Sequence, residues 1–129
     1  MPRENRRSYR TARASRGVPS ARIATALALR WARLRGGVIT FDDEFGLYVS
    51  TGMRGGFARG GTTVGGVFLT RKPPSRRLLR HEAVHADQWA RHGLGFAVRY
   101  LWEELHNPGS RNRFEIEAGL GDGGYCPSV

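Results

Sequence analysis

Apolar residues recur at three- and four-residue steps after Pro19 and predict an amphipathic helix that ends near Gly36-Gly37. The large apolar side chains that share one stripe of this helix are Ile23, Leu27, Trp31 and Leu34. Several arginines lie to one side of the stripe. We interpret the stripe as the face that packs onto the protein core, in preference to a membrane-surface helix.

A second helix is predicted over residues 76–92. Pro73-Pro74 block a helix upstream, Ser75 is a suitable N-cap, and the next glycine or proline is Gly93, which suits the position just after a helix. The residues that share one side of this helix are Leu78, His81, His85 and Trp89. We therefore expect both histidines to face the interior.

The rest of the pattern is typical of short strands and two more helices. The expected strands cover residues 38–41, 45–50 and 64–70, with the first two joined as a hairpin, and the expected helices cover 96–105 and about 112–120. The glycine-rich stretch 51–66 lacks the ending and the following helix of a phosphate-binding loop. We interpret it as loops and a twisted strand.

Residues 81–85 read His-Glu-Ala-Val-His, an H-E-x-x-H motif. Two histidines four residues apart lie about 40° apart around a helix axis, close enough to hold one metal ion. Two neutral imidazoles are good zinc ligands and leave positions for a third ligand and a water molecule. Glu82 is placed to take a proton from that water. The motif predicts a hydrolytic zinc centre if a third ligand exists.

Three candidates for the third ligand follow the motif. The metzincin pattern requires a histidine at position 91, where this chain has an arginine, so that pattern fails. His106 belongs to a different predicted helix, and Glu115 and Glu117 lie about thirty residues downstream of the motif. Two helical residues that are two apart point to different faces, so only one of the glutamates can reach the metal.

The runs His-Glu-Ala-Val-His-Ala-Asp-Gln-Trp and Asn-Arg-Phe-Glu-Ile-Glu-Ala resemble small bacterial zincin-like proteins of the gluzincin type, similar in scale to the minigluzincins. The resemblance covers about residues 62–121. It implies an α+β, zincin-like fold in which a small twisted β-sheet packs on the H-E-x-x-H helix, with a second helix that carries a glutamate. The leading glutamate of the gluzincin Glu-x-x-Ala-Asp pattern binds the metal. Glu115 occupies that position here, although Gly119 replaces the final aspartate.

The resemblance therefore implies a zinc-dependent metallopeptidase in which His81, His85 and Glu115 hold Zn²⁺ and Glu82 is the general base. A peptide or protein substrate is expected, and the strand over 64–70 is a candidate for pairing with it. Tyr100, His106 and Tyr125 are candidates for stabilising the developing oxyanion. Gln88 and Asp87 are candidates for hydrogen bonds to the metal ligands.

The chain has 129 residues and a formal net charge of +10, but this charge is unevenly distributed. Residues 1–35 contain ten arginines and one acidic residue (+9), whereas residues 36–129 contain eleven basic and ten acidic residues (+1). We expect residues 1–18 to be a disordered basic arm before a single domain over 19–129. A nearly neutral domain argues against a specific nucleic-acid partner.

Two further features bear on location. Cys126 is the only cysteine, which excludes an intrachain disulfide, and no apolar run is long enough to span a bilayer. Arginines interrupt the apolar stretch Ile23–Leu29, which does not suit a signal peptide. We therefore expect a cytoplasmic protein without a transmembrane segment.

Two other functions compete with the metallopeptidase. The small size leaves little material to wall a substrate cleft, so a non-catalytic zincin-fold protein that binds zinc or a protein partner is the first alternative. A nucleic-acid binder that uses the arginine arm is the second.

Overall fold

A computed structural model describes residues 2–124, and a four-stranded sheet lies at its centre. The strands β1 (Val38–Asp42), β2 (Leu47–Thr51), β3 (Gly61–Val64) and β4 (Val67–Thr70) have the order β1-β2-β4-β3. β2 is antiparallel to β1 and parallel to β4, and β3 is antiparallel to β4. The chain is thus α+β with a small mixed sheet, and β3 forms one of its edges.

The hairpin predicted near residues 38–50 is confirmed. The strand predicted over 64–70 is confirmed only for residues 67–70, which form β4, because Val64 belongs to β3. The chain reverses at Gly65-Gly66, which separates β3 from β4. Gly65 has a φ of 58°, and a Cβ atom on Gly66 would lie 2.2 Å from the carbonyl oxygen of Ala14. This tight reversal requires glycine because it is pressed against the backbone of another segment.

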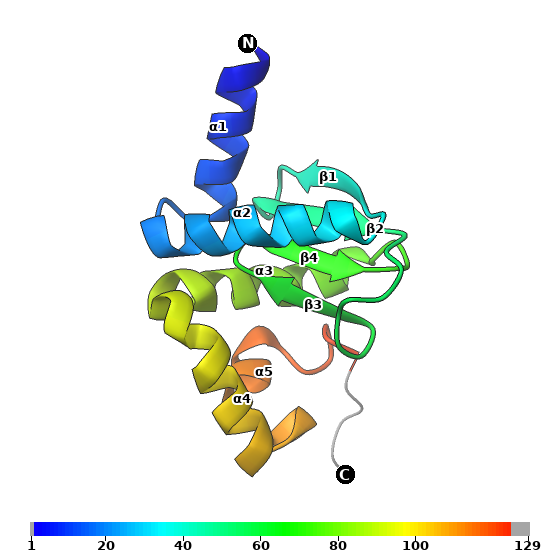
Figure 1. Cartoon of the computed structure of the whole chain (residues 1–129). Coiled ribbons are helices and arrows are strands. Elements are labelled where there is room, and N and C mark those ends of the chain that lie inside the picture. The colour runs from blue at the N-terminus through cyan, green and yellow to red at the C-terminus, as the bar shows by residue number, and fades with distance from the viewer. Residues whose placement is uncertain (1, 125–129) are drawn as a thin grey trace.

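The helices are α1 (Arg3–Ala14), α2 (Pro19–Leu34), α3 (Arg76–His92), α4 (Phe96–His106) and α5 (Arg113–Ala118), with single 3₁₀ turns at Gly93–Gly95 and Gly109–Arg111. The four helices predicted from residue 19 onward are therefore confirmed. α2 packs on one face of the sheet, where Ala28 and Leu29 meet Val67 and Leu69. α3 packs on the other face through Leu79 and Ala86 (Figure 1).

Helix α1 occupies the segment that the sequence predicts to be a disordered arm. Its last turn is anchored, because Ala14 and Ser15 are fully buried and Thr11 shares a hydrogen bond with the Tyr48 hydroxyl of β2. The guanidinium of Arg16 donates to the carbonyl oxygen of Gly46 at 2.6 Å and to Asp87 at 2.7 Å. The exposed first turns of α1 project from the body (Figure 1). Composition predicts disorder for this segment because it does not reveal the contacts that the end of α1 makes with the sheet.

The orientation of α2 also differs from its prediction. The face that packs on the sheet consists mainly of small side chains: Ala21, Ala24, Thr25, Ala28, Leu29 and Ala32. A Cβ atom on Gly65 would lie 2.6 Å from the Thr25 amide nitrogen, so the helix lies too close to the β3–β4 turn for larger residues. The stripe that begins at Ile23 and ends at Leu34 is therefore exposed.

In the described part of the chain, no helix is both long enough and apolar enough to cross a membrane.

Candidate metal centre

Helix α3 places the two histidines of the H-E-x-x-H motif one turn apart. Ser75 caps its start by accepting a hydrogen bond from the Leu78 amide at 3.1 Å, and Gly93, with a φ of 68°, ends it. Leu79 and Ala86 fasten the helix to the sheet. His81 and His85 are consequently buried, with exposed fractions of 2% and 6%, as the inward stripe predicts.

Helix α5 brings a glutamate to the same place. Asn112 is fully buried and caps α5 by accepting a hydrogen bond from the Phe114 amide at 2.9 Å, while its side-chain amide donates to Glu104 of α4. Phe114 packs with Trp89 and Phe96 in an aromatic cluster. With α5 fixed in this way, Glu115 is buried against α3.

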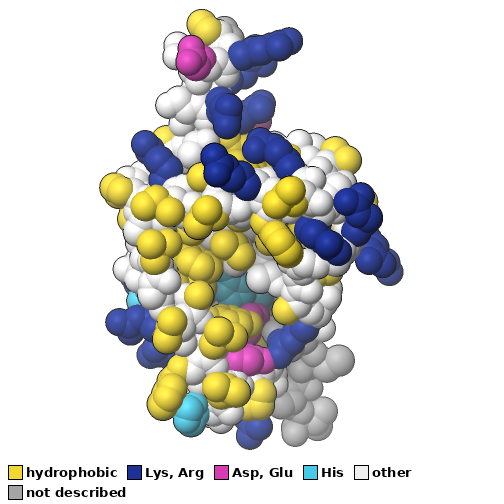
Figure 2. All heavy atoms as spheres, viewed as in Figure 1, with side chains coloured by type: hydrophobic (Ala, Val, Ile, Leu, Met, Phe, Trp, Pro, Cys, Tyr) yellow, Lys and Arg dark blue, Asp and Glu magenta, His cyan; other side chains and the backbone are white. Residues whose placement is uncertain are grey.

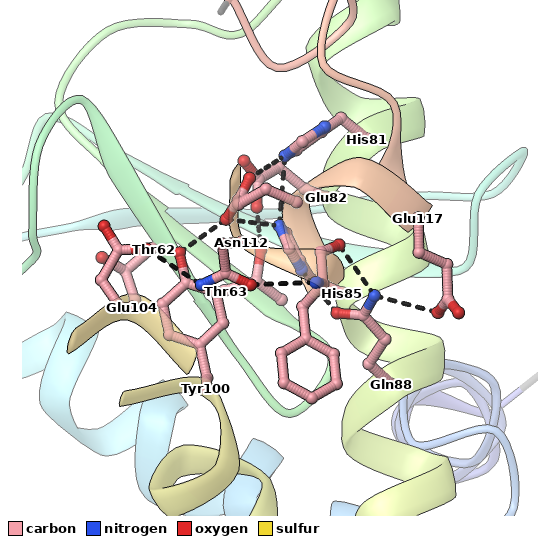
Figure 3. Close-up of polar contacts among 12 residues, drawn as sticks. Thr62, Thr63, His81, Glu82, His85, Gln88, Tyr100, Glu104, Asn112 and Glu117 are labelled. Atoms are coloured by element: carbon pink, nitrogen blue, oxygen red, sulfur yellow. Dashed lines mark hydrogen bonds and ion pairs between the residues drawn. The ribbon is translucent and has the colours of Figure 1, made fainter. Parts of the chain in front are cut away.

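The donor atoms of His81, His85 and Glu115 form one compact group. The Nε2 atoms of the two histidines are 3.1 Å apart, and Glu115 places Oε2 2.9 Å from Nε2 of His81 and Oε1 3.1 Å from Nε2 of His85. Figure 3 shows the two rings projecting from α3. These three buried side chains could hold one metal ion.

Hydrogen bonds at the Nδ1 atom of each ring fix the orientation and the tautomer of the two imidazoles. Nδ1 of His81 lies 2.7 Å from the carbonyl oxygen of Gly119, and Nδ1 of His85 lies 2.8 Å from Oε1 of Gln88. The amide nitrogen of Gln88 donates to the Phe114 carbonyl and to Glu117 (Figure 3). Both Nδ1 atoms therefore face acceptors and carry the proton, which leaves each Nε2 lone pair directed at the group.

This arrangement fits a zinc ion. Four lone-pair-bearing atoms converge, so a proton or a metal cation must lie among them. Donor atoms bound to one tetrahedral zinc at about 2.0–2.1 Å are about 3.3 Å from each other, close to the 2.9–3.1 Å found here. Acceptors for the outer N–H of each ring are also the usual support of metal-binding histidines.

The electrostatics of the group favour positive charge at its centre. Burial by itself lowers the pKa of His81 and His85, but hydrogen bonds to Glu115, the nearby negative charge of Glu82 and the hydrogen bonds to Gly119 and Gln88 together outweigh burial and raise both pKa values. Burial raises the pKa of Glu115, yet the hydrogen bonds from both histidines and Tyr100, together with the charge of His85, hold that pKa well below its usual range. Without metal, the carboxylate is ionised and the rings bind protons unusually well.

Glu82 lies beside this group but is held by a different element. It is 7% exposed, and its Oε2 accepts a hydrogen bond of 2.5 Å from the Thr63 hydroxyl of β3. The Trp89 indole N–H donates to the Thr63 carbonyl at 3.0 Å, which ties β3 to α3. Burial raises the pKa of Glu82, against the opposing charges of His85 and His81. A raised pKa makes a carboxylate a better proton acceptor near neutral pH.

The remaining candidates take other roles. Glu117 accepts from Gln88 and pairs with Arg91, and Asp87 pairs with Arg16. Tyr100 donates to Oε1 of Glu115 at 2.6 Å, so it supports a ligand. His106 bonds to the Trp102 carbonyl at the end of α4, outside the cluster. Tyr125 lies outside the described residues.

Sequence reasoning missed one element that supports the centre. The segment after α5 folds over His81: Gly119 accepts its Nδ1 proton, and a Cβ atom on Gly123 would lie 2.4 Å from its Cε1 atom. Asp122 holds this segment through ion pairs with Arg77 and Arg80 of α3. The short i, i+3 spacing of Arg77 and Arg80 is the only hint of a shared partner.

Comparisons of the chain with protein-family models, with curated proteins and with solved structures give no match. The interpretation of the centre therefore rests on its own geometry.

Proposed function

We propose that this protein is a zinc-dependent peptide hydrolase with a zincin-like fold, in which His81, His85 and Glu115 hold the metal and Glu82 is the general base. The observation that carries the proposal is the convergence of two Nε2 lone pairs and one ionised carboxylate in a buried group. Each ligand has a partner that orients it: Gly119, Gln88 and Tyr100 respectively.

When bound, the zinc ion would supply a Lewis acid that lowers the pKa of water to near neutrality. The proton released then goes to Glu82, whose pKa is raised by burial. Thr63 holds Oε2 of Glu82, so that Glu82 accepts the proton from a fixed position and returns it to the leaving amine. Removal of the Glu82 carboxylate should stop the proton transfer without removing a metal ligand.

The edge strand β3 suits an extended peptide substrate. Its neighbour in the sheet is β4, and β3 ends the strand order on that side. A peptide that adds to this edge would form backbone hydrogen bonds. Because Thr63 of β3 contacts Glu82, such a peptide would run past the proton acceptor. We thus assign to β3 the pairing with substrate that the sequence analysis expects of the strand over residues 64–70.

The decisive experiment measures metal content and hydrolysis together. Protein purified without chelators should contain about one zinc per chain, and Glu82→Gln should retain the metal while hydrolysis of a peptide library falls at least about a hundredfold, the lower end of what a general base contributes. Asp87→Asn, an exposed acid on the same helix, is the matched control. Protein that binds no zinc, or a Glu82→Gln variant with undiminished hydrolysis, would contradict the proposal.

One observation favours a second candidate, a zincin-fold protein that binds zinc without catalysis. The ligands are no more than 6% exposed, and the segment 119–124 covers His81. A closed structural site has no open position for substrate. One bound zinc per chain, combined with absence of cleavage across a peptide library, would support this candidate over the hydrolase.

A further inference from the structure

Helix α2 presents its largest side chains to the outside. Ile23, Leu27, Trp31 and Leu34 are 52%, 59%, 44% and 71% exposed, while alanines fill the inward face. The free energy of burying a leucine or tryptophan far exceeds that of burying an alanine. An outward stripe of this kind is unfavourable in water and is typical of a surface that binds a protein partner or a membrane.

Helix α4 continues the same surface. Val98, Leu101, Trp102 and Leu105 are each more than 60% exposed. The chain links the two helices closely, because Gly93, just before α4, lies against Ser20 at the start of α2. Figure 2 shows apolar side chains over both helices on one side of the molecule, around a hollow with histidine at its floor. We call the exposed apolar residues named above on these two helices the apolar face: Ile23, Leu27, Trp31, Leu34, Val98, Leu101, Trp102 and Leu105.

A basic hollow adjoins the apolar face. It has a volume of about 290 Å³ between α1 and α2, and its lining includes five arginines: Arg3, Arg6, Arg7, Arg10 and Arg33. The other lining residues are Leu29 and Tyr48, so no acidic residue lines it. Figure 2 shows basic side chains gathered on α1 and along its junction with α2, next to the apolar residues. Guanidinium groups match the geometry of phosphate oxygens.

We propose that the basic hollow and the apolar face together dock on a membrane surface rich in anionic phospholipids. The arginines would contact lipid phosphates, while Leu27, Trp31 and the side chains of α4 would insert at the boundary between headgroups and acyl chains. Residues 1–35 contribute ten of the chain's basic residues and one acid, so the charge is concentrated where the phosphates would lie. Tryptophan at both helices suits this boundary.

The proposal is independent of the metal centre, and vesicle binding tests it with the full-length chain. The chain should sediment with phosphatidylcholine vesicles that contain phosphatidylglycerol, and not with phosphatidylcholine alone. Fluorescence should shift to the blue on binding, because Trp31 and Trp102 leave water whereas Trp89 is already buried. Metal-free protein and the His85→Ala variant should bind equally well, provided that they remain folded.

Two test variants, each with a control variant, separate the contribution of the apolar face to vesicle binding from that of the basic hollow. Leu27→Ser combined with Trp102→Ser should weaken vesicle partitioning at least about tenfold, whereas Ile116→Ser, at an apolar residue 53% exposed on α5, should not. Arg7→Gln with Arg33→Gln should also weaken it about tenfold. Lys72→Gln with Arg111→Gln removes the same net charge outside the hollow and should have a much smaller effect.

Several results would overturn the proposal. Binding that is equal for neutral and anionic vesicles, or that survives both test pairs in folded protein, would remove its basis. Concentration-dependent dimers that Leu27→Ser with Trp102→Ser dissociates would assign the apolar face to a second copy of the chain. Failure to bind vesicles, together with salt-sensitive binding of RNA through Arg7 and Arg33, would assign the hollow to nucleic acid.

Discussion

Replacement of Gln88 with leucine tests the most specific claim about the centre, that a buried amide orients a metal ligand. Gln88 is fully buried, and its Oε1 accepts the Nδ1 proton of His85 at 2.8 Å. Its nitrogen donates to the Phe114 carbonyl and to Glu117, which joins α3 to α5. Leucine has a similar shape but can make none of these hydrogen bonds.

Two magnitudes follow from these contacts. Loss of a hydrogen-bond partner of a metal ligand weakens metal affinity about ten- to a hundredfold, or about 1.4–2.7 kcal/mol. The His85 N–H and the Phe114 carbonyl would also remain buried without this partner, which costs about 1–3 kcal/mol each. Gln88→Leu should thus lower the free energy of unfolding of the metal-free protein by about 2–6 kcal/mol and weaken zinc binding as well.

Zinc affinity is measured by competition with a fluorescent chelator, and unfolding by circular dichroism in denaturant. Gln88→Glu keeps an acceptor for His85 but loses the donors, so it should retain more zinc affinity than Gln88→Leu. Asp87→Asn, at the exposed neighbouring position, should leave the affinity within about twofold of the original. Folded Gln88→Leu protein that binds zinc as tightly as the original chain would refute the orienting role of Gln88.

Three other predictions concern the same centre. Glu115→Gln should weaken zinc binding more than about a hundredfold while Glu117→Gln changes it only a few-fold; calorimetric titration checks this, and equal losses would mean that the choice of ligand is wrong. Because the pKa values of both ligand histidines are raised above 6.5, their protons stabilise the metal-free fold fully below pH 6.5, and this contribution is lost as the pH rises through the raised values. Zinc binding should show the opposite trend, strengthening over the same rise in pH, and melting curves with and without zinc at a series of pH values would reveal a failure of either trend. Asp122→Ala should speed zinc release to a chelator by freeing the segment over His81, whereas Asp87→Ala, which breaks an ion pair with Arg16, should not; unchanged release in Asp122→Ala would exclude a covering role.

The choice between Glu115 and Glu117 illustrates what sequence reasoning could reach. The helical geometry shows that only one of them can face the metal, but the sequence does not fix the rotation of α5 about its axis. That rotation depends on Asn112, whose side chain bonds to Glu104, and on Phe114, which packs with Trp89 and Phe96. These contacts join residues from three helices, so the periodicity of any one segment cannot reveal them.

The sequence by itself determined the features that depend on near neighbours in the chain. The cap at Ser75, the end at Gly93 and the spacing of His81 and His85 follow from interactions within a few residues, and the structure has them as predicted. The tertiary structure decided the rest. The small side chains of α2 face inward because the Gly65-Gly66 turn lies against its backbone, and the segment 119–124 reaches His81 because Asp122 pairs with arginines of α3. Such contacts depend on how closely distant segments approach, which no local pattern encodes.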